Sequence, residues 1–342
     1  MNKRIKVKFI SRGDNETWLR QFPNNSPIWG DCEFLFNINN EHYDWLVVYD
    51  EFPRKGDPTS YISKEILRCN IENTLLITVE PPNIKYYSKA YTHQFGWVLT
   101  AHPEWSLKHP GRIFSQPALR WFYGAHNNTK YNNLISSTTQ KYKTISTVCS
   151  SKQQKHTLHK KRFEFVLKIK ELLPCLDIYG RGINPIHDKS EAIDRYKYHL
   201  IIENYQGKHH WTEKLADSFL GLSFPFYFGC TNIKDYFPED SIEVIDLNCV
   251  DSASKIIHNM IDNNEYNDRI HALEESKNLI LTKYNLFSVL STEIAKRHTP
   301  RSKLQPKYII HSRKALRRNP ILAITDAYNK ITHRISHTTT YK

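Results

Sequence analysis

The sequence has no apolar run long enough to cross a membrane. A membrane-spanning helix needs roughly 18 or more consecutive apolar residues, and no stretch of the 342 residues reaches that length. The first residues, MNKRIKVKFIS, are basic but lack the long apolar core of a secretory signal peptide. We therefore expect a cytoplasmic protein without a membrane-spanning helix.

Cysteine is scarce and dispersed. The six cysteines form no close pairs in the sequence, which argues against a zinc site and against a disulfide framework. They are Cys32, Cys69, Cys149, Cys175, Cys230 and Cys249. Reduced thiols agree with the expected cytoplasmic location.

Positive charge is abundant but unevenly distributed. The chain carries a net charge of +13, with 39% hydrophobic and 24% charged residues, a composition typical of a globular protein. Residues 301–342 contain ten Lys or Arg and one acid, Asp326, so this segment alone contributes +9 and the other 300 residues +4. The basic character therefore belongs to the C-terminal segment, and the rest is long enough for two domains.

Short apolar segments alternate with helical patterns through the first part of the chain. Residues 62–69 and 84–95 predict helices, and a polar stretch at 125–143 predicts a linker. Segments rich in β-branched or aromatic residues predict strands at 5–10, 32–36, 45–49, 75–79 and 97–100.

The alternation continues beyond the linker. Strands are expected at 144–149, 176–180, 199–203, 224–229 and 241–247, and helices at 156–173, 213–222 and within 252–297. Strands interleaved with helices predict an α/β fold, in which mostly parallel sheets are covered on both faces. Two such halves indicate two Rossmann-like domains.

The most informative segment is residues 196–229, YKYHLIIENYQGKHHWTEKLADSFLGLSFPFYFG. An apolar strand ends at Asn204, a polar loop follows, and Thr212 can cap a helix that begins at Glu213. A second strand completes a βαβ unit, whose loop opens at the carboxyl edge of a parallel sheet. The helix N-terminus favours a phosphate, beside which Lys214 would lie, and Glu213 suits a ribose or sugar hydroxyl.

This segment resembles the donor-binding signature of the family 10 glycosyltransferases, the α-1,3/1,4-fucosyltransferases of bacterial type. The resemblance spans about residues 75–285 and is strongest over 144–250. It implies a GT-B fold with an acceptor-binding domain at 1–130, a nucleotide-sugar-binding domain at 143–298 and the active site in the cleft between them. The matching residues are, in order, Tyr196-Lys197-Tyr198, Glu203-Asn204, Trp211-Thr212-Glu213-Lys214 and Pro225-Phe226-Tyr227-Phe228-Gly229.

The same resemblance implies which residues bind the donor, GDP-fucose. Arg162 would contact the diphosphate together with Lys214, although Lys160 and Lys161 are alternatives to Arg162. Glu213 would bind the ribose, and His210 stands where the family has a tyrosine. The other expected donor-binding residues are Glu203, Asn204, Thr212, Tyr227 and Gly229.

The chain contains no Asp-x-Asp sequence, the usual carboxylate pair that holds a metal ion on a diphosphate. Cationic side chains and a helix N-terminus would then stabilise the leaving diphosphate. We therefore expect no metal and no cofactor besides the donor substrate. The adjacent His209 and His210 lack the i, i+4 spacing of a helical metal-binding pair.

Glu80 is the predicted catalytic base. It follows a predicted strand, and Glu80-Pro81-Pro82-Asn83 matches the E-x-P-N context of the family's catalytic glutamate. The alternative is an ordinary loop residue. The expected reaction is the inverting transfer of fucose from GDP-fucose to a hydroxyl of a glycan that contains N-acetylglucosamine or glucose, as in lipopolysaccharide. The alternatives are a GT-B enzyme with another nucleotide sugar and an inactive relative.

The segment 299–342 is predicted to be a basic tail. Its apolar residues recur at roughly helical spacing, which favours an amphipathic helix on an anionic membrane surface. The alternative is a disordered, solubilising tail. A nucleic-acid-binding role for the tail is a further alternative, but the rest of the chain carries no recognition motif, so we expect no nucleic-acid partner. The apolar residues are Ile321, Leu322, Ile324, Ala327, Tyr328 and Ile331.

Overall fold

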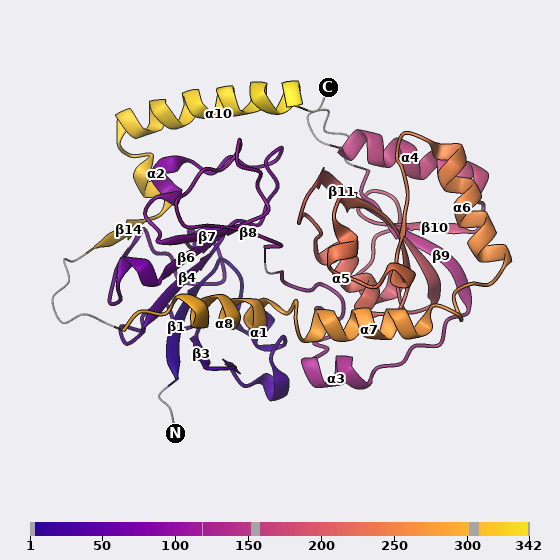
Figure 1. The fold of residues 1–342 in the computed structure, drawn as a ribbon, viewed down its shortest axis with the longest axis horizontal. Coiled ribbons are helices and arrows are strands. Elements are labelled where there is room, and N and C mark those ends of the chain that lie inside the picture. Colours follow the sequence, from indigo (N-terminus) through magenta and orange to yellow (C-terminus); the bar gives the residue numbers. More distant parts are fainter. Residues whose placement is uncertain (1–3, 118, 152–157, 301–307, 341–342) are drawn as a thin grey trace. The chain divides into compact units, whose positions relative to one another are not determined.

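The computed structural model describes residues 4–117, 119–151, 158–300 and 308–340 (Figure 1). The chain divides into two compact units. Unit 1 comprises Met1–Ala118 and Leu286–Lys342, and unit 2 comprises Leu119–Asn285. At the two ends of unit 2, Leu119 and Asn285 pair with each other as a parallel β-bridge.

The described part of unit 1 is built on a sheet of seven strands. Neighbouring strands are parallel, except that the short β2 pairs antiparallel with β3. The order reverses between β1 and β4, the position at which parallel sheets form a crevice at their carboxyl ends. Across the sheet the strands are β2 (Ile28–Trp29), β3 (Cys32–Leu35), β1 (Ile5–Ile10), β4 (Trp45–Tyr49), β6 (Thr74–Ile77), β7 (Trp97–Thr100) and β8 (Arg112–Phe114).

Both faces of this sheet are covered by apolar side chains. Successive residues of a strand point to opposite faces, so Phe9 joins one buried cluster and Ile10 the other. Helix α8 (Leu286–Arg297), which follows unit 2 in the sequence, packs Phe287 and Leu290 into the first cluster. The second cluster includes Tyr91 of the short helix α2 (Lys89–Thr92).

The C-terminal segment is an ordered part of unit 1. Strand β14 (Ile309–His311) pairs antiparallel with β5 (Lys64–Ile66), and two helices follow, α9 (Arg313–Leu316) and α10 (Pro320–Thr340). A helix was expected here and is present, whereas the alternative of a disordered tail is wrong for residues 308–340. In the part of the chain that the structure describes, no helix is long and apolar enough to cross a membrane.

The described part of unit 2 contains a parallel sheet of five strands. The chain runs from β9 to β10 on one side and then crosses to β11 on the other, so the order reverses between β9 and β11. Helices α4 (His159–Leu172) and α6 (Val250–Asp262) contact each other, as do α5 (Glu213–Leu220) and α7 (Ile270–Leu281). The strands in order are β10 (Leu176–Tyr179), β9 (Lys143–Val148), β11 (Tyr196–Gly207), β12 (Phe224–Cys230) and β13 (Glu243–Val244).

The predicted α/β class is confirmed, and each unit contains a mostly parallel sheet, as expected for GT-B. The bounds of the units differ from those predicted. Helix α8 was expected in the second domain but packs in unit 1, and residues 119–130 lie in unit 2. The apolar pattern of a helix says that it covers a sheet but not which sheet it covers.

Of the two helices expected in the first part of the chain, the one at 62–69 is wrong and the one at 84–95 is only partly present. Residues 62–69 contain β5, in which a buried Glu65 lies between exposed Lys64 and Ile66, the alternation of a strand. In residues 84–95 only α2 is helical. The buried Tyr87 and Tyr91 are four residues apart, which resembles a helix, but Tyr87 lies in a loop and binds Asp50.

Candidate active site

A cavity of about 280 Å³ lies in unit 2 where the strand order reverses. Residues from β9 and β11 and from the first turns of α4 and α5 form its wall. Four residues predicted from the sequence, Arg162, Asn204, Glu213 and Lys214, come together there. The wall also contains Val148, Ser150, His159, Lys189, Ile193, His199, Leu200, Ile201, Ile202 and Asp217.

The first turn of α5 is anchored by a buried carboxylate. Glu203, at 0% exposure, accepts hydrogen bonds from the backbone N–H of Thr212 at 2.9 Å and from its hydroxyl at 2.8 Å. The Thr212 hydroxyl oxygen in turn caps the helix by accepting from the N–H of Lys214. Glu203 and Thr212 therefore hold the helix N-terminus at the cavity, as a predicted donor loop requires.

Lys214 places an ammonium group at this helix N-terminus. Its Nζ lies 3.2 Å from Glu203, 3.0 Å from the Thr212 hydroxyl and 3.3 Å from Glu213. Burial disfavours the charge, but the two carboxylates raise the pKa of Lys214 above its ordinary value. Burial also opposes ionisation of Glu213, yet Lys214 and Lys189 lower the pKa of Glu213 to about 2. At neutral pH both groups are charged.

Arg162 supplies a second cation to the cavity wall. It is buried on α4 and donates from Nη1 to the side-chain oxygen of Asn204 at 2.8 Å. Arg162 is close enough to Lys214 for the two charges to repel, which counteracts the rise in the pKa of Lys214. Two cations beside a capped helix N-terminus form an environment that stabilises a diphosphate.

Lys189 is a third cation in the wall, and sequence analysis missed it. Its Nζ lies 2.7 Å from Asp217 and 3.8 Å from Glu213. Asp217 is fully buried and also accepts the backbone N–H groups of Phe122 and Tyr123, each at 2.9 Å. Lys189 comes from a short 3-10 helix, Lys189–Ala192, and no sequence motif pointed to it.

His199 was also missed as a site residue, although a polar residue inside an apolar strand is a usable signal. Its ring is buried, and burial lowers the pKa of His199 to about 3. Ser146 donates its single hydroxyl proton to the carbonyl of Ala192, so Nδ1 of His199 must donate to the Ser146 oxygen, 2.8 Å away. Nε2 is then an acceptor, and it has no hydrogen-bond partner among the described residues. The cavity therefore offers an unused acceptor.

Five predicted donor-binding residues do not line this cavity: Glu203 and Thr212, which anchor α5, and also His210, Tyr227 and Gly229. His210 is buried with its ring edge against Tyr205, at a centroid distance of 5.3 Å. The Tyr227 hydroxyl accepts from the N–H of Cys230 at 2.9 Å. A Cβ atom on Gly229 would lie 2.4 Å from the Cγ of Glu203, so only glycine leaves room for that carboxylate. Tyr227 and Gly229 therefore shape the surroundings of Glu203.

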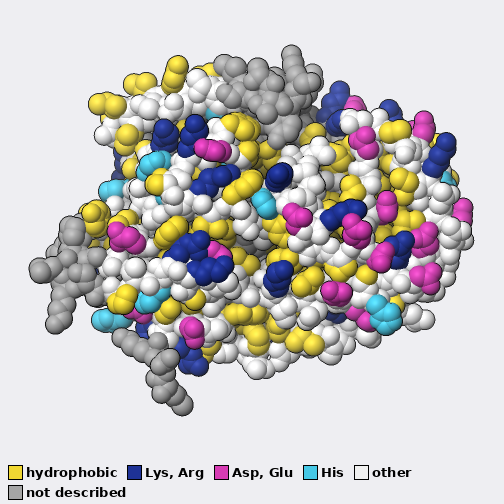
Figure 2. All heavy atoms as spheres, in the orientation of Figure 1, with side chains coloured by type: hydrophobic (Ala, Val, Ile, Leu, Met, Phe, Trp, Pro, Cys, Tyr) yellow, Lys and Arg dark blue, Asp and Glu magenta, His cyan; other side chains and the backbone are white. Residues whose placement is uncertain are grey.

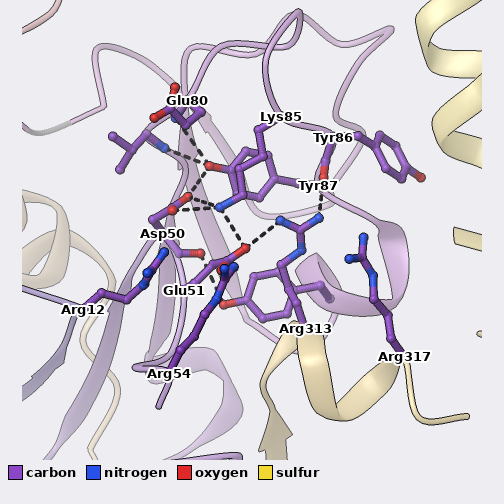
Figure 3. A network of polar contacts seen from close by, with 12 residues as sticks. Arg12, Asp50, Glu51, Arg54, Glu80, Lys85, Tyr86, Tyr87, Arg313 and Arg317 are labelled. Carbon is purple, nitrogen blue, oxygen red and sulfur yellow. Dashed lines mark hydrogen bonds and ion pairs between the residues drawn. The ribbon is translucent and has the colours of Figure 1, made fainter. Parts of the chain in front are cut away.

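Glu80 belongs to unit 1, where it follows β6 and has an exposed side chain. Its backbone is held on both sides, because its N–H donates to the Tyr87 hydroxyl at 3.4 Å and its carbonyl accepts from Nε2 of His102 at 2.8 Å. Figure 3 shows Glu80 at the edge of a network of charged side chains from the carboxyl end of the sheet. The position agrees with the sequence prediction, and the catalytic role stays a prediction.

No group of three or more His, Cys, Asp or Glu side chains within the described residues could hold a metal ion. The expected independence from metal stays a prediction.

Comparison with known proteins bears on the cavity directly. Residues 138–284 match the family described as glycosyltransferase family 10 (fucosyltransferase) C-term. These residues form a family 10 glycosyltransferase domain. The matched range contains the entire wall of the cavity. It covers less than half of the chain and does not include Glu80.

One relative matches a short part of the chain. Over 69 residues the chain is 33% identical to the α-(1,3)-fucosyltransferase FucT of Helicobacter pylori. The match covers 20% of this chain and 14% of the length of that protein.

Solved structures of similar fold have low sequence identity to the chain. A crystal structure of an α1,3-fucosyltransferase with GDP has a TM-score of 0.47 at 15% identity and covers 83% of this chain and 92% of that one. A DNA-modifying β-glucosyltransferase has a TM-score of 0.46 at 9% identity and covers 85% and 100%. Similarity at this level says nothing about the substrate of this chain.

Proposed function

We propose that the protein is an inverting fucosyltransferase that transfers fucose from GDP-fucose to a hydroxyl group of a glycan, forming an α-1,3 or α-1,4 linkage. One observation supports this above the others: a family 10 domain places Arg162, Lys214 and a capped helix N-terminus around one cavity. The acceptor in this proposal contains N-acetylglucosamine or glucose, as in lipopolysaccharide. No metal ion is required.

The donor would bind with its diphosphate at the start of α5. Lys214 and Arg162 carry the positive charge that a departing diphosphate needs, and the positive end of the helix dipole adds to it. Glu213, ionised at neutral pH, would accept a hydrogen bond from the ribose. His199 offers its free Nε2 to an N–H or O–H group of the nucleotide. Asn204 holds Arg162 in position.

The acceptor side would be served by Glu80 as general base. In a single displacement, the acceptor oxygen attacks the anomeric carbon, the bond from that carbon to the diphosphate breaks, and the configuration inverts. Glu80 would take the hydroxyl proton, and GDP would leave with the electron pair, stabilised by Lys214 and Arg162. His210 of the loop and Tyr227 and Gly229 of β12 would contribute indirectly, through the surroundings of Glu203.

The test is a transfer reaction analysed by mass spectrometry. The protein is incubated with GDP-fucose and a panel of N-acetyllactosamine-type acceptors, with and without EDTA. We expect a product heavier by one fucose residue and no effect of EDTA. Calorimetric titration with GDP-fucose, GDP-mannose and UDP-sugars distinguishes the donor. Binding of a UDP-sugar in place of GDP-fucose would favour the alternative, a glycosyltransferase with another donor.

We also propose that α10 places the protein at an anionic membrane surface from the cytoplasmic side. Hydrophobic side chains line the outer edge of this helix in Figure 2, and Ile321, Ile324, Tyr328 and Ile331 are between 59% and 74% exposed. Lys330 and Arg334 are exposed basic residues of the same helix. An apolar stripe beside basic residues favours adsorption to anionic lipid.

Sedimentation with anionic vesicles tests this second proposal. We expect Ile324→Ser with Ile331→Ser to reduce vesicle binding, and Ile135→Ser, an exposed isoleucine of α3 (Tyr131–Ser136), to leave it unchanged. Equal binding by all variants would argue against a role of α10 at membranes.

A further inference from the structure

The C-terminal segment 308–340 is joined to unit 1 by specific hydrogen bonds as well as by β14. The N–H of Ser312 donates to the carbonyl of Ser63 at 2.8 Å. The Gln94 side chain binds both backbone groups of His311, at 2.8 Å and 3.1 Å. Ile310 is 1% exposed and belongs to one of the two apolar cores of the sheet. The segment is therefore built into the unit that carries Glu80.

Arg313, the first residue of α9, enters the charged network at the carboxyl end of the sheet. Figure 3 shows its guanidinium between Glu51 and the backbone carbonyl of Tyr86, at 2.7 Å and 2.9 Å. Glu51 is 3% exposed and follows β4, at the point where the strand order reverses. Burial opposes its ionisation, but Lys85 and Arg313 lower the pKa of Glu51 to about 2.

The network continues from Glu51 to the backbone of Glu80. Lys85 bridges Glu51 at 2.9 Å and Asp50 at 2.7 Å. The Tyr87 hydroxyl donates its proton to Asp50, so its oxygen can only accept from other groups. It accepts from the N–H of Val79 at 3.2 Å and of Glu80 at 3.4 Å. Through these contacts, the charges around Asp50 and Glu51 orient the amide side of Glu80.

A second chain of hydrogen bonds reaches the carbonyl side of Glu80 from α10. Nε2 of His333 lies 2.7 Å from the Ser106 hydroxyl oxygen. This oxygen lies 2.9 Å from Nδ1 of His102, and Nε2 of His102 lies 2.8 Å from the carbonyl oxygen of Glu80. His333 is buried and lies against Trp105 and Tyr86, with ring centroids 5.1 Å and 5.2 Å apart.

The donor and the acceptor in each hydrogen bond between His333 and Glu80 can be assigned, starting from the carbonyl of Glu80. A carbonyl oxygen only accepts, so Nε2 of His102 carries a proton. Burial lowers the pKa of His102 to about 4, so the ring is neutral near pH 7 and Nδ1 must accept from Ser106. The single hydroxyl proton of Ser106 is thereby used, and the oxygen must accept from His333. Each donor points from α10 toward Glu80.

We propose that the C-terminal segment positions Glu80 for catalysis, with His333 and Arg313 as positioning residues. The segment reaches both peptide groups of Glu80. One route leads from His333 through Ser106 and His102 to the carbonyl of Glu80. The other leads from Arg313 through Glu51, Lys85, Asp50 and Tyr87 to its amide N–H. This inference rests on the proposed role of Glu80 as base. It gives the basic C-terminal segment a part in the transfer reaction that does not depend on a membrane.

Variants of His333 in the full-length chain test the proposal. His333→Phe keeps a ring against Trp105 but removes the donor, and His333→Gln restores an N–H group near the same place. We expect His333→Phe to lower kcat about fivefold to tenfold, with an unchanged Kd for GDP-fucose, and His333→Gln to recover most of the loss. Exchange of the backbone amide hydrogens of residues 78–80 should be faster in His333→Phe than in the native chain and near native in His333→Gln.

Arg313 provides a second test with a matched control. Arg313→Leu removes the cation beside Glu51, and Arg317→Leu removes an arginine of the same segment that pairs with Asp326 at 2.9 Å. We expect a lower kcat and faster amide exchange at residues 78–80 for Arg313→Leu only. The Kd for GDP-fucose and the melting temperature of each variant identify any general loss of folding.

The outcomes separate this proposal from the proposed function. If Glu80→Gln is inactive while His333→Phe has native kcat and native exchange, the positioning role is rejected and Glu80 remains the base. If His333→Phe and His333→Gln are equally impaired, the hydrogen-bond chain is not the cause and the proposal is also rejected. Full turnover by Glu80→Gln would instead remove Glu80 from the mechanism.

Discussion

Glu203 lies fully buried beneath the first turn of α5 and accepts a hydrogen bond from the Lys214 ammonium at 3.2 Å. The same carboxylate accepts from the backbone and the hydroxyl of Thr212, the cap of that helix. One acid therefore holds both the helix N-terminus and a cation of the cavity. Because Glu203 and Lys214 contribute both to stability and to the proposed donor site, a single substitution changes both quantities at once. A double substitution is needed to separate the effect on stability from the effect on donor affinity.

The first prediction concerns Lys214. Lys214→Met should weaken GDP-fucose binding about tenfold to a hundredfold, because a charge-assisted contact to the diphosphate is lost. It should also lower the free energy of unfolding by about 2 kcal/mol, because Glu203 keeps a buried charge without its cation. Calorimetric titration and denaturant unfolding measure the two effects.

The double variant Lys214→Met with Glu203→Gln is the control. It should regain most of the lost stability but none of the lost affinity. Lys208→Met, at an exposed lysine of the same loop, should change neither quantity. Recovery of affinity in the double variant would mean that the Lys214 ammonium does not bind the donor.

The second prediction concerns Glu80. Glu80→Gln should reduce kcat by a factor of about 10² to 10⁴, the range that general-base catalysis contributes. The Kd for GDP-fucose should stay the same, since the cavity lies in the family 10 domain and Glu80 does not. Glu104→Gln, at another exposed glutamate of unit 1, should keep native turnover. Steady-state kinetics together with titration decide between a base and an ordinary loop residue.

The third prediction concerns His199. His199→Phe removes the free acceptor from the cavity wall and should raise the Kd for GDP-fucose about fivefold to tenfold. The Kd for inorganic pyrophosphate should stay unchanged, because it lacks the ribose and the base, whose N–H and O–H groups would donate to Nε2. Equal affinities of the native and variant proteins for GDP-fucose would show that the ring only fills space.

The fourth prediction concerns the pH dependence of stability. Burial lowers the pKa of His102 to about 4 from an ordinary value of 6.5. Between these values the unfolded chain binds a proton that the folded chain does not, so stability is complete above pH 6.5 and falls as the pH decreases toward 4. For His102 the loss is about 3 kcal/mol, and His199 adds to it. Urea unfolding measured at intervals from pH 7 to pH 4 tests this.

His102→Gln identifies the source of that pH dependence. The variant cannot titrate, so its stability should fall less steeply over the same interval. The lowered pKa values of Glu51 and Glu213 act between about pH 4.5 and pH 2, so they overlap with this window only below pH 4.5. A slope as steep in His102→Gln as in the native chain would exclude His102 as its cause.

The sequence predicted those cavity residues that lie close together along the chain. Strand, cap, helix and strand follow one another between residues 196 and 229, so Asn204, Glu213 and Lys214 could be assigned from order and spacing. Arg162 required a second motif, which the resemblance supplied. Lys189 belongs to no recognisable sequence motif, and only the folded structure brings it close to Asp217 and Glu213.

Long-range packing in unit 1 was beyond sequence reasoning. The composition of residues 301–342 indicated a basic tail, but nothing local shows that β14 pairs with β5 or that α8 covers the sheet of unit 1. The helix expected at 62–69 is absent and the one expected at 84–95 is reduced to α2 for the same reason, because packing against distant strands decides the backbone conformation there. The helix in residues 320–340 was recognisable because its apolar spacing is local.

The pairing of Leu119 with Asn285 brings the first and last residues of unit 2 together. A segment whose two ends are adjacent can be produced separately without disrupting its internal contacts. Residues 119–285 include the whole cavity wall. We expect this fragment, produced alone, to fold and to take up GDP-fucose while transferring nothing, since Glu80 is left behind. Binding of the sugar nucleotide would then need only unit 2, whereas transfer of the sugar would also need unit 1.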